Sequence, residues 1–268
     1  MSALVLTLRS RPAQRVDLLP LTAQPLAGRS IRDIAALPLP SGNRTIPLGE
    51  LFAVEGTPGN EIEIRNSCDQ LDRIGAGLAE GAITVTGDAG AFLGIRLAGG
   101  TITVQGSTGA WTAAGMTAGL IRVNGNTGDF LGGAMPGDHQ GMKGGTVVVR
   151  GDAGARAGVS MKAGTILIEG GCGYMTGFMA QNGTIIVCGD AGEALADSMY
   201  EAVVYVGGSI RSLGSDAEAR EPNAEELAYL NETLLPFGID AKRDWKRVAS
   251  GRRLWNFSRH EALWREAL

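Results

Sequence analysis

The residues between 81 and 200 form a repeat of almost constant period, and this feature constrains the fold more than any other. Weaker rows of the same kind begin near Asn60 and at Ala202. The spacing of the six clear rows is 19 residues, except after the third row, where it is 26 residues. A regular interval of this kind predicts a solenoid, in which each repeat stacks on the one before it. The six rows have the form G-T-I-x-V-x-G-D-x-G-x-x-x-G and begin at Gly81, Gly100, Gly119, Gly145, Gly164 and Gly183.

The apolar residues within each row alternate with a period of two. The third and fifth positions are β-branched in every row, as in Ile83 and Val85 or Ile185 and Val187. This alternation indicates one strand per row with one buried face. A left-handed helix of hexapeptides would show an aliphatic residue every six positions, and these rows show one strand in 19 residues. We therefore predict an all-β fold, a right-handed parallel β-helix of about eight coils.

Three further columns of the repeat have a structural interpretation. Two glycine columns, which begin at Gly87 and Gly90, predict corners that need a positive φ or a close approach of two backbones. Short polar residues between them are expected to bind the amides of their own turns, and they are Asp88, Ser107, Asn126, Asp152 and Asp190. A column of flexible apolar residues is expected to fill the core, and it consists of Leu97, Met116, Met135, Met161 and Met199.

The sequence divides into three parts around this repeat. Residues 1–59 do not repeat and are predicted to be an N-terminal segment that caps the first coil, because an open end of a β-helix is an unpaired strand edge. Residues 60–215 are predicted to form the parallel β-helix. Residues 216–268 are predicted to be a helical and aromatic C-terminal segment, with a helix from Asn223 to about Leu235. Its aromatic residues either pack on their own domain or dock on a partner.

The strand position between the two interior columns points away from the core. Along the chain it changes from polar to apolar, and a contiguous apolar strip is normally covered. Either the C-terminal segment or another subunit is expected to lie over it. We interpret the apolar residues of this strip, together with His139, as facing a partner, and these are Val148, Leu167, Ile186 and Tyr205.

The seven additional residues of the third row are the one irregularity of the solenoid. The alignment of rows places them at about Pro136 to Met142. An insertion into a repeat is normally a surface loop, and such loops often carry function. This one brings Asp138, Gln140 and Lys143 close together. It is either a solvent-exposed loop or a contact to a partner subunit or an anionic ligand.

Few residues are suited to catalysis or metal binding. Histidine occurs only at His139 and His260, and this leaves little material for a zinc or iron site. The three cysteines form no C-x-x-C pair, and we expect Cys172 and Cys188 to be inert. No G-x-S-x-G motif accompanies His139. We therefore expect no catalytic residue and no metal site in this chain.

Charge and hydropathy narrow the class of protein further. The formal net charge of −4 argues against a nucleic-acid-binding face. No apolar run reaches about 18 residues, so we expect no membrane span. The N-terminus lacks the basic and then apolar order of a signal peptide. We expect a cytoplasmic protein that binds neither nucleic acid nor membrane.

The rows resemble a known family. The G-x-x-G-x-x-x-G repeat is similar to the β-helical C-terminal domain of glutamate synthase large subunits, and more closely to the C subunit of formylmethanofuran dehydrogenase. The stretch MPGDHQGMKGG and the rows that follow it, as far as Glu193, look like the core of that subunit. The strands expected before Gly81 and the helical end after Pro222 fit it too, so the resemblance covers most of the chain.

This resemblance implies a non-catalytic subunit of a multisubunit one-carbon enzyme. In the archaeal dehydrogenase, other subunits carry the tungsten or molybdenum pterin, the iron–sulfur clusters and a dinuclear metal hydrolase site. In a related bacterial formyltransferase/hydrolase complex, formyl passes from formyl-tetrahydromethanopterin to a methanofuran-type carrier and is then hydrolysed to formate. Four lysines against 20 arginines suggest a GC-rich genome and favour the bacterial complex. The implied partners are metallohydrolase-like and formyltransferase-like chains. The carrier is shared within the complex, and no cofactor is expected to be bound by this chain itself.

Five cationic residues lie in coils three and four beside the insertion. If the resemblance holds, they are candidates for holding an anionic polyglutamate tail of the carrier or for contacting a partner, and the alternative is ordinary solvated surface charge. They are Arg122, Lys143, Arg150, Arg156 and Lys162.

Two rival classes stay open. One is a glutamate-synthase-like structural domain, which would normally belong to a larger chain. The other is a carbohydrate-active β-helix enzyme, which needs several acidic or basic residues on one coil face and long loops. Only one short insertion is present here, and an assay of the purified chain for lyase or hydrolase activity distinguishes this class.

Overall fold

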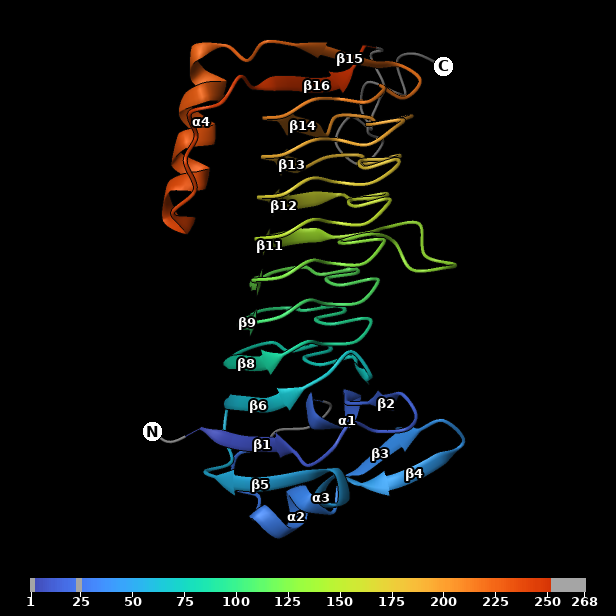
Figure 1. The fold of residues 1–268 in the computed structure, drawn as a ribbon, viewed down its shortest axis with the longest axis vertical. Coiled ribbons are helices and arrows are strands. Elements are labelled where there is room, and N and C mark those ends of the chain that lie inside the picture. Colours follow the sequence, from blue (N-terminus) through green and yellow to red (C-terminus); the bar gives the residue numbers. More distant parts are fainter. Residues whose placement is uncertain (1–2, 23–25, 252–268) are drawn as a thin grey trace, which may run out of the picture.

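The protein is a tall stack of coils, a β-solenoid of about eight turns (Figure 1). The structure is a computed structural model that describes residues 3–22 and 26–251. One long sheet runs the length of the stack in the order β15-β16-β14-β13-β12-β11-β10-β9-β8-β6-β1-β5. Each coil contributes one parallel strand to this sheet, and these strands are β6 (Glu61–Ser67), β8 (Ala82–Gly87), β9 (Thr101–Val104), β10 (Leu120–Val123), β11 (Lys143–Val149), β12 (Ala163–Ile168), β13 (Thr184–Val187) and β14 (Val203–Val206).

Equivalent residues of successive rows pair directly across the sheet. Ile83 pairs with Ile102, and Ile166 pairs with Ile185. The two β-branched columns are buried and belong to one continuous core. The glycine corners form a second column of parallel bridges, such as Ala89 with Thr108. The predicted parallel β-helix with one strand per row is therefore confirmed.

The polar side chains at the corners connect neighbouring coils. The amide of Ser107 donates to Asp88 Oδ1 at 2.8 Å, and the amide of Asn126 donates to Ser107 Oγ at 3.1 Å. The same relation joins the amide of Asp152 to Asn126 Oδ1 at 2.8 Å and the amide of Gly171 to Asp152 Oδ1 at 2.7 Å. Our expectation that these groups bind their own turns was wrong. Stacked coils lie about 4.8 Å apart, so the equivalent amide of the next coil is within reach of a short side chain.

Close approach, and not a positive φ, explains glycine at most corners. A Cβ at Gly106 would lie 2.7 Å from the carbonyl oxygen of Gly87, and a Cβ at Gly109 would lie 2.7 Å from the amide nitrogen of Ala91. Neither Gly106 nor Gly109 has a positive φ. Any larger residue in these columns would push two coils apart.

The N-terminal residues extend the long sheet at one end of the stack. β1 (Leu4–Leu8) pairs parallel with β6 and antiparallel with β5 (Phe52–Gly56). A second sheet has the order β4-β3-β2-β7. Its strands are β2 (Val16–Asp17), β3 (Pro38–Ser41), β4 (Arg44–Pro47) and β7 (Leu71–Asp72), and the helices of this region are α1 (Leu19–Thr22), α2 (Ile31–Ala35) and α3 (Leu48–Leu51).

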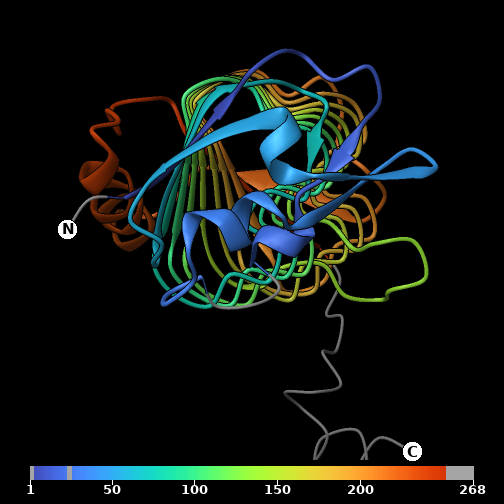
Figure 2. The ribbon, with the colours of Figure 1, turned by 90° about the horizontal axis from the view of Figure 1, so that it is seen from below.

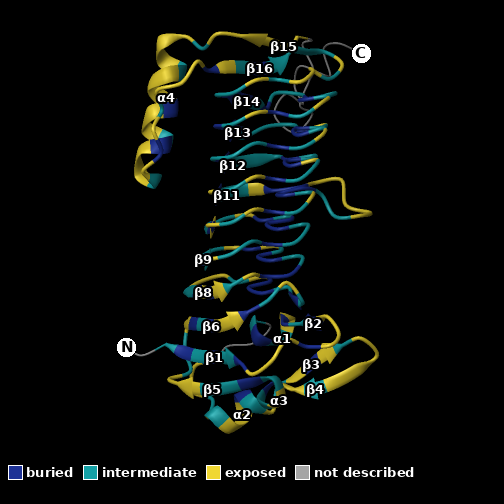
Figure 3. Cartoon of the chain, viewed as in Figure 1, coloured by how far each residue is buried: buried dark blue, intermediate teal, exposed yellow. Residues whose placement is uncertain are grey.

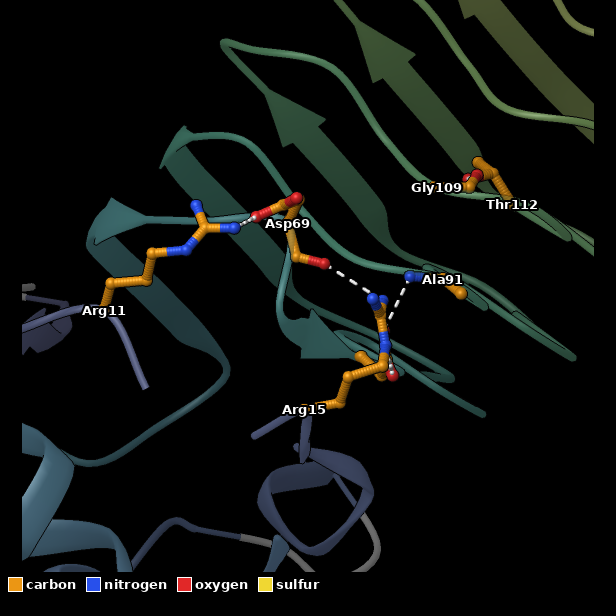
Figure 4. Close-up of polar contacts among 7 residues, drawn as sticks. Arg11, Arg15, Asp69, Ala91, Gly109 and Thr112 are labelled. Carbon is orange, nitrogen blue, oxygen red and sulfur yellow. Dashed lines mark hydrogen bonds and ion pairs between the residues drawn. The ribbon is translucent and has the colours of Figure 1, made fainter. Parts of the chain in front are cut away.

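Two arginines attach the N-terminal residues to the first coil (Figure 4). Arg11 forms an ion pair with Asp69 at 2.7 Å, and Arg15 donates to the carbonyl oxygen of Asp69 at 3.0 Å. Arg15 also binds the carboxylate of Asp72, whose Oδ1 accepts the amide of Ala91 at 2.7 Å. Asp72 thus binds both Arg15 of the N-terminal residues and the amide of the next coil, so it joins the two.

The C-terminal residues add two strands and a helix at the other end. β16 (Lys246–Ser250) lies antiparallel between β14 and β15 (Ala217–Arg220). Between β15 and β16 the chain forms α4 (Ala224–Leu234) and the short 3-10 helix η1 (Leu235–Phe237), which lie beside the upper strands of the stack (Figure 1). The predicted helix is confirmed, and its Asn223 cap forms a capping box with Glu226. The two strands were not predicted because AEAR and KRVAS are short and lack a clear apolar alternation. The predicted tail aromatics Trp255, Phe257 and Trp264 lie outside the described residues.

Candidate functional site

The apolar part of the outward strand face is covered by the protein's own C-terminal segment. Val148, Leu167 and Ile186 are at most 2% exposed, and Tyr205 is 5% exposed. The interpretation of these four residues as facing a partner was therefore wrong, because an amphipathic helix from the same chain buries them. Figure 3 shows the buried inner side and the exposed outer side of α4. The covering residues that pack in this cluster are Leu230, Leu234, Ile239 and Trp245.

An ion-pair cluster fastens α4 to the last strands. The Glu226 carboxylate accepts hydrogen bonds from both terminal nitrogens of Arg220 at 2.7 and 2.8 Å. Arg247 Nε of β16 lies 2.7 Å from Glu226 Oε1. The bonds from Arg220 lower the pKa of Glu226 from 4.5 to about 2. Glu226 thus joins the helix to β15 and β16 at a single carboxylate.

The insertion is placed slightly differently from the sequence alignment of rows. The Gly141 amide donates to the carbonyl of Ser160, and the Lys143 amide donates to the carbonyl of Met116, so the regular coil resumes at Gly141. Met142 is fully buried in the column of Met116 and Met161, whereas Met135 is only half-buried. The expectation that Met135 fills the core was wrong, because the seven additional residues precede Met142. The loop that they form projects from the stack on the same side as the β3–β4 hairpin (Figure 2).

The insertion forms one wall of a polar groove. The groove has a volume of about 430 Å³ and is lined by residues of the loop and of the two preceding coils. Arg96 lies 3.7 Å from Asp138, and both side chains are at least half exposed. The insertion therefore brings His139 and Lys143 together with Arg96, which the sequence pattern did not single out. The lining residues are Arg96, Gly115, Thr117, Asp138, His139, Gln140 and Lys143.

The five cationic candidates do not gather at one place. Arg122 lies over the Phe237 ring, with 5.6 Å from its guanidinium carbon to the ring centroid. Arg150 donates to Glu169 at 2.7 Å and to the carbonyl of Phe237. Both therefore belong to the contact with the C-terminal segment. Lys162 donates to Gln181, and of the five only Lys143 lines the groove at the insertion.

Arg156 belongs to a ladder of rings that was not predicted from the sequence. Trp111 stacks on Phe92 with 5.5 Å between ring centroids and on Phe130 with 4.6 Å. Arg73 lies over Phe92 at 5.5 Å, and Arg156 lies over Phe130 at 5.6 Å. The signal was available, because the three aromatic residues hold the same position in three consecutive rows. We call Arg73, Phe92, Trp111, Phe130 and Arg156 the arginine–aromatic ladder.

The cysteines are poorly placed for nucleophilic chemistry. Burial raises the pKa of the Cys172 thiol and of the Cys188 thiol, so little reactive thiolate forms near neutral pH.

Residues 3–22 and 26–251 contain no group of three His, Cys, Asp or Glu side chains that could hold a metal ion. Within the same ranges, no helix is long and apolar enough to cross a membrane.

No family model matches the chain, but a solved structure covers almost all of it. A chain of the X-ray crystal structure of the formyltransferase/hydrolase complex (FhcABCD) from Methylorubrum extorquens in complex with methylofuran superposes with a TM-score of 0.81. The two chains are 32% identical, and the match covers 88% of this chain and 89% of the other. This chain belongs to the family formed by the C subunits of formylmethanofuran dehydrogenase and of the Fhc complex.

Curated relatives align with part of the sequence. The C subunit of tungsten-containing formylmethanofuran dehydrogenase 2 from Methanococcus maripaludis is 34% identical over 97 residues, which are 35% of this chain and 36% of the relative. The Fhc C subunit of the formyltransferase/hydrolase complex from Methylorubrum extorquens is 35% identical over 85 residues, or 32% of each chain. Protein GlxC of Rhizobium meliloti is 40% identical over 67 residues, which are 24% of this chain and 29% of the relative. These alignments span about a third of the length of the curated relatives.

Proposed function

We propose that the protein is the non-catalytic scaffold subunit of a formyltransferase/hydrolase complex. The observation that carries the proposal is the match to a chain of such a complex at 32% identity over 88% of this chain. The reaction of the complex would transfer formyl from formyl-tetrahydromethanopterin to a methanofuran-type carrier and hydrolyse the formyl-carrier to formate. The partners would be a metallohydrolase-like chain and a formyltransferase-like chain.

The physical properties of the stack support a scaffold. Each coil is joined to the next by strand pairing, by a buried core and by the corner hydrogen bonds, so the stack is stiff along its axis. A stiff rod that binds two enzymes holds their sites at a fixed separation. A tethered carrier then meets both sites at a high effective concentration.

The same fold also supports a second candidate, the C subunit of an archaeal-type formylmethanofuran dehydrogenase. The observation in its favour is the 34% identity to the Methanococcus maripaludis protein. This chain would have the same scaffold role in both complexes, and the chemistry of the partner chains would differ. A tungsten or molybdenum pterin in the purified complex would favour the dehydrogenase.

The groove at the insertion fits an anionic part of the carrier better than the other candidate sites do. Arg96 and Lys143 supply two cations, and Thr117 supplies a hydroxyl, which are suitable donors for a carboxylate. Arg96 also has a partner, Asp138, but the two groups are 3.7 Å apart and at least half exposed, so a ligand can compete for Arg96. Arg122 and Arg150 lie against the C-terminal segment, and Lys162 is bonded to Gln181 and does not line the groove. The polyglutamate tail would therefore lie at Arg96 and Lys143, and not along all five predicted cations.

Native mass spectrometry of the affinity-purified complex tests the proposed function. A complex that contains hydrolase-like and transferase-like chains and converts formyl-tetrahydromethanopterin to formate would support it. A chain that purifies alone, or that turns over substrate without partners, would contradict it. For the groove, the R96A/K143A variant should weaken carrier binding in an assembled complex, with R122A as the matched control, and equal affinity of both variants would refute the assignment.

A further inference from the structure

The arginine–aromatic ladder holds bulky residues in a backbone conformation that they rarely adopt. The φ angles of Phe92, Trp111 and Phe130 are 62°, 57° and 63°. Glycine or asparagine fits such left-handed positions with less strain. Met175 and Ala194, which hold the same position in later rows, have φ angles of 56° and 53°, so this conformation belongs to the corner of the coil and does not by itself indicate a function. What distinguishes the ladder is that large rings occupy three of these corners in succession and stack on one another.

The coil after Arg156 carries further exposed apolar side chains. Tyr174, whose carbonyl accepts the amide of Arg156 at 2.7 Å, is 48% exposed, and Met179 of the same coil is 39% exposed. Phe178 lies between them in sequence and is half-buried. The C-terminal segment covers the strand side of the stack, and its described residues form no cluster with these side chains. We call the ladder together with Tyr174 and Met179 the aromatic face.

The aromatic face has a cationic frame. Arg73 ends the ladder at one side and pairs with Asp17, and Arg156 ends it at the other. Within residues 3–22 and 26–251, Arg156 forms no ion pair with an acidic side chain. The outer edges of stacked rings are also electropositive. Arg156 is therefore the cation of this face that an acidic group of a partner can neutralise, whereas the charge of Arg73 is already balanced by Asp17.

The composition of this face matches the centre of protein–protein interfaces. Trp, Tyr, Phe, Met and Arg are enriched there, and Trp, Tyr and Arg are the residue types that contribute most to binding energy. The β3–β4 hairpin and the insertion loop bracket the ladder at its two ends. Gly42 of the hairpin turn lines a pocket with Arg73 and Phe92, and the insertion begins a few residues after Phe130. A partner seated on the ladder would contact both projections.

We propose that the aromatic face binds another protein subunit of the complex, one whose contact surface has an apolar centre and a carboxylate that pairs with Arg156. This inference rests on the proposed scaffold function and adds to it the surface by which the scaffold binds a partner subunit. The covered strand side is then structural, and the loop side is the side that recognises the partner.

Charge reversal at exposed positions tests the proposal without disturbing the core. In the double variant R156E/Y174D, both changes lie on the aromatic face. The matched control L235D/K242E makes similar changes on the C-terminal segment, where Leu235 is 69% exposed. Each variant is tagged and co-expressed with the partner subunits, and the retained subunits are quantified by native mass spectrometry. Unfolding midpoints equal to that of the wild type establish that the variants are folded.

We expect R156E/Y174D to retain at least tenfold less partner than the wild type, and the control to retain as much as the wild type. Equal retention by both variants would overturn the inference, as would a self-association of the purified chain that R156E/Y174D abolishes. Hydrogen exchange in the wild-type complex should show protection of loops 90–97, 109–116 and 173–180, and protection confined to other faces would also overturn it. A wild-type chain that retains no partner would instead refute the proposed function.

Discussion

The carboxylate of Glu226 should control how firmly the C-terminal segment closes over the solenoid. It receives two hydrogen bonds from Arg220 and contacts Arg247, and its side chain is only 17% exposed. Its pKa is lowered from 4.5 to about 2. At about 1.4 kcal/mol per pKa unit, this shift corresponds to at most about 3.4 kcal/mol of stability. Because water reaches the cluster, we expect about half of that, ~1.5–2 kcal/mol, for Glu226→Gln at pH 7.

The sign of the pH dependence follows from the lowered pKa. Above the unfolded-state pKa of about 4.5 the carboxylate contributes its full stabilisation, and this contribution is lost as the pH falls toward about 2. The stability difference between the wild type and E226Q should therefore be largest above pH 5 and shrink steadily below it. Arginines stay protonated throughout, so they add no slope of their own.

Urea unfolding from pH 2.5 to 7 and hydrogen exchange of the α4 amides would measure this effect. At pH 7 we expect the α4 amides of E226Q to exchange about 10-fold to 30-fold faster, the factor that ~1.5–2 kcal/mol implies. The glutamine keeps the capping-box geometry with Asn223, so loss of the cap does not explain the change. A stability difference between the wild type and E226Q that is independent of pH would show that the charge of Glu226 does not hold the C-terminal segment in place.

Three further pairs of substitutions, each a test and its control, probe the packing of the stack. Asp152→Ala should cost about 1 kcal/mol in urea unfolding because it removes an inter-coil hydrogen bond, whereas Asp152→Asn retains an acceptor and should cost less than half as much. Leu167→Ala, which removes a side chain buried beneath α4, should lower the free energy of unfolding by ~2–5 kcal/mol. Leu227→Ala, at a side chain that is 44% exposed, should change it by no more than about 0.5 kcal/mol. Equal effects of the two substitutions would contradict the covering role of α4. Gly106→Ala should lower the thermal midpoint because its Cβ would meet the carbonyl of the coil below, while Gly59→Ala, where nothing lies within 4 Å, should leave it nearly unchanged.

The periodic part of the fold could be predicted from sequence because each row repeats the same physical requirement. Ile83, Ile102 and their equivalents recur at the same two positions of every row, and only stacked strands bury all of them at once. The predictions that failed involve relations between rows. Asp88 binds the next coil because of the strand spacing, and Met142 takes the place of Met135 because an alignment alone does not locate seven additional residues within a loop.

The candidate site was less accessible to prediction for a related reason. Leu167 is apolar whether its cover is a partner or α4, so its side chain alone could not distinguish the two. Lys143 was correctly placed beside the insertion, but Arg96 reaches the groove from a coil two rows earlier. The ladder was visible as a column of Phe92, Trp111 and Phe130. Arg73 and Arg156 hold the same position of the repeat, 19 residues before Phe92 and 26 residues after Phe130. Only the contacts of these arginines with the neighbouring rings required the three-dimensional stack.

Both ends of the parallel stack are closed by an antiparallel strand, β5 on β1 and β16 on β14. Parallel coils could otherwise be added without limit, so these antiparallel strands fix the length of the stack. One more row of 19 residues inserted after the groove would displace the C-terminal segment from it by about 4.8 Å. The distance between groups bound near the two ends is therefore set by the number of rows in the sequence, and each row adds one strand spacing.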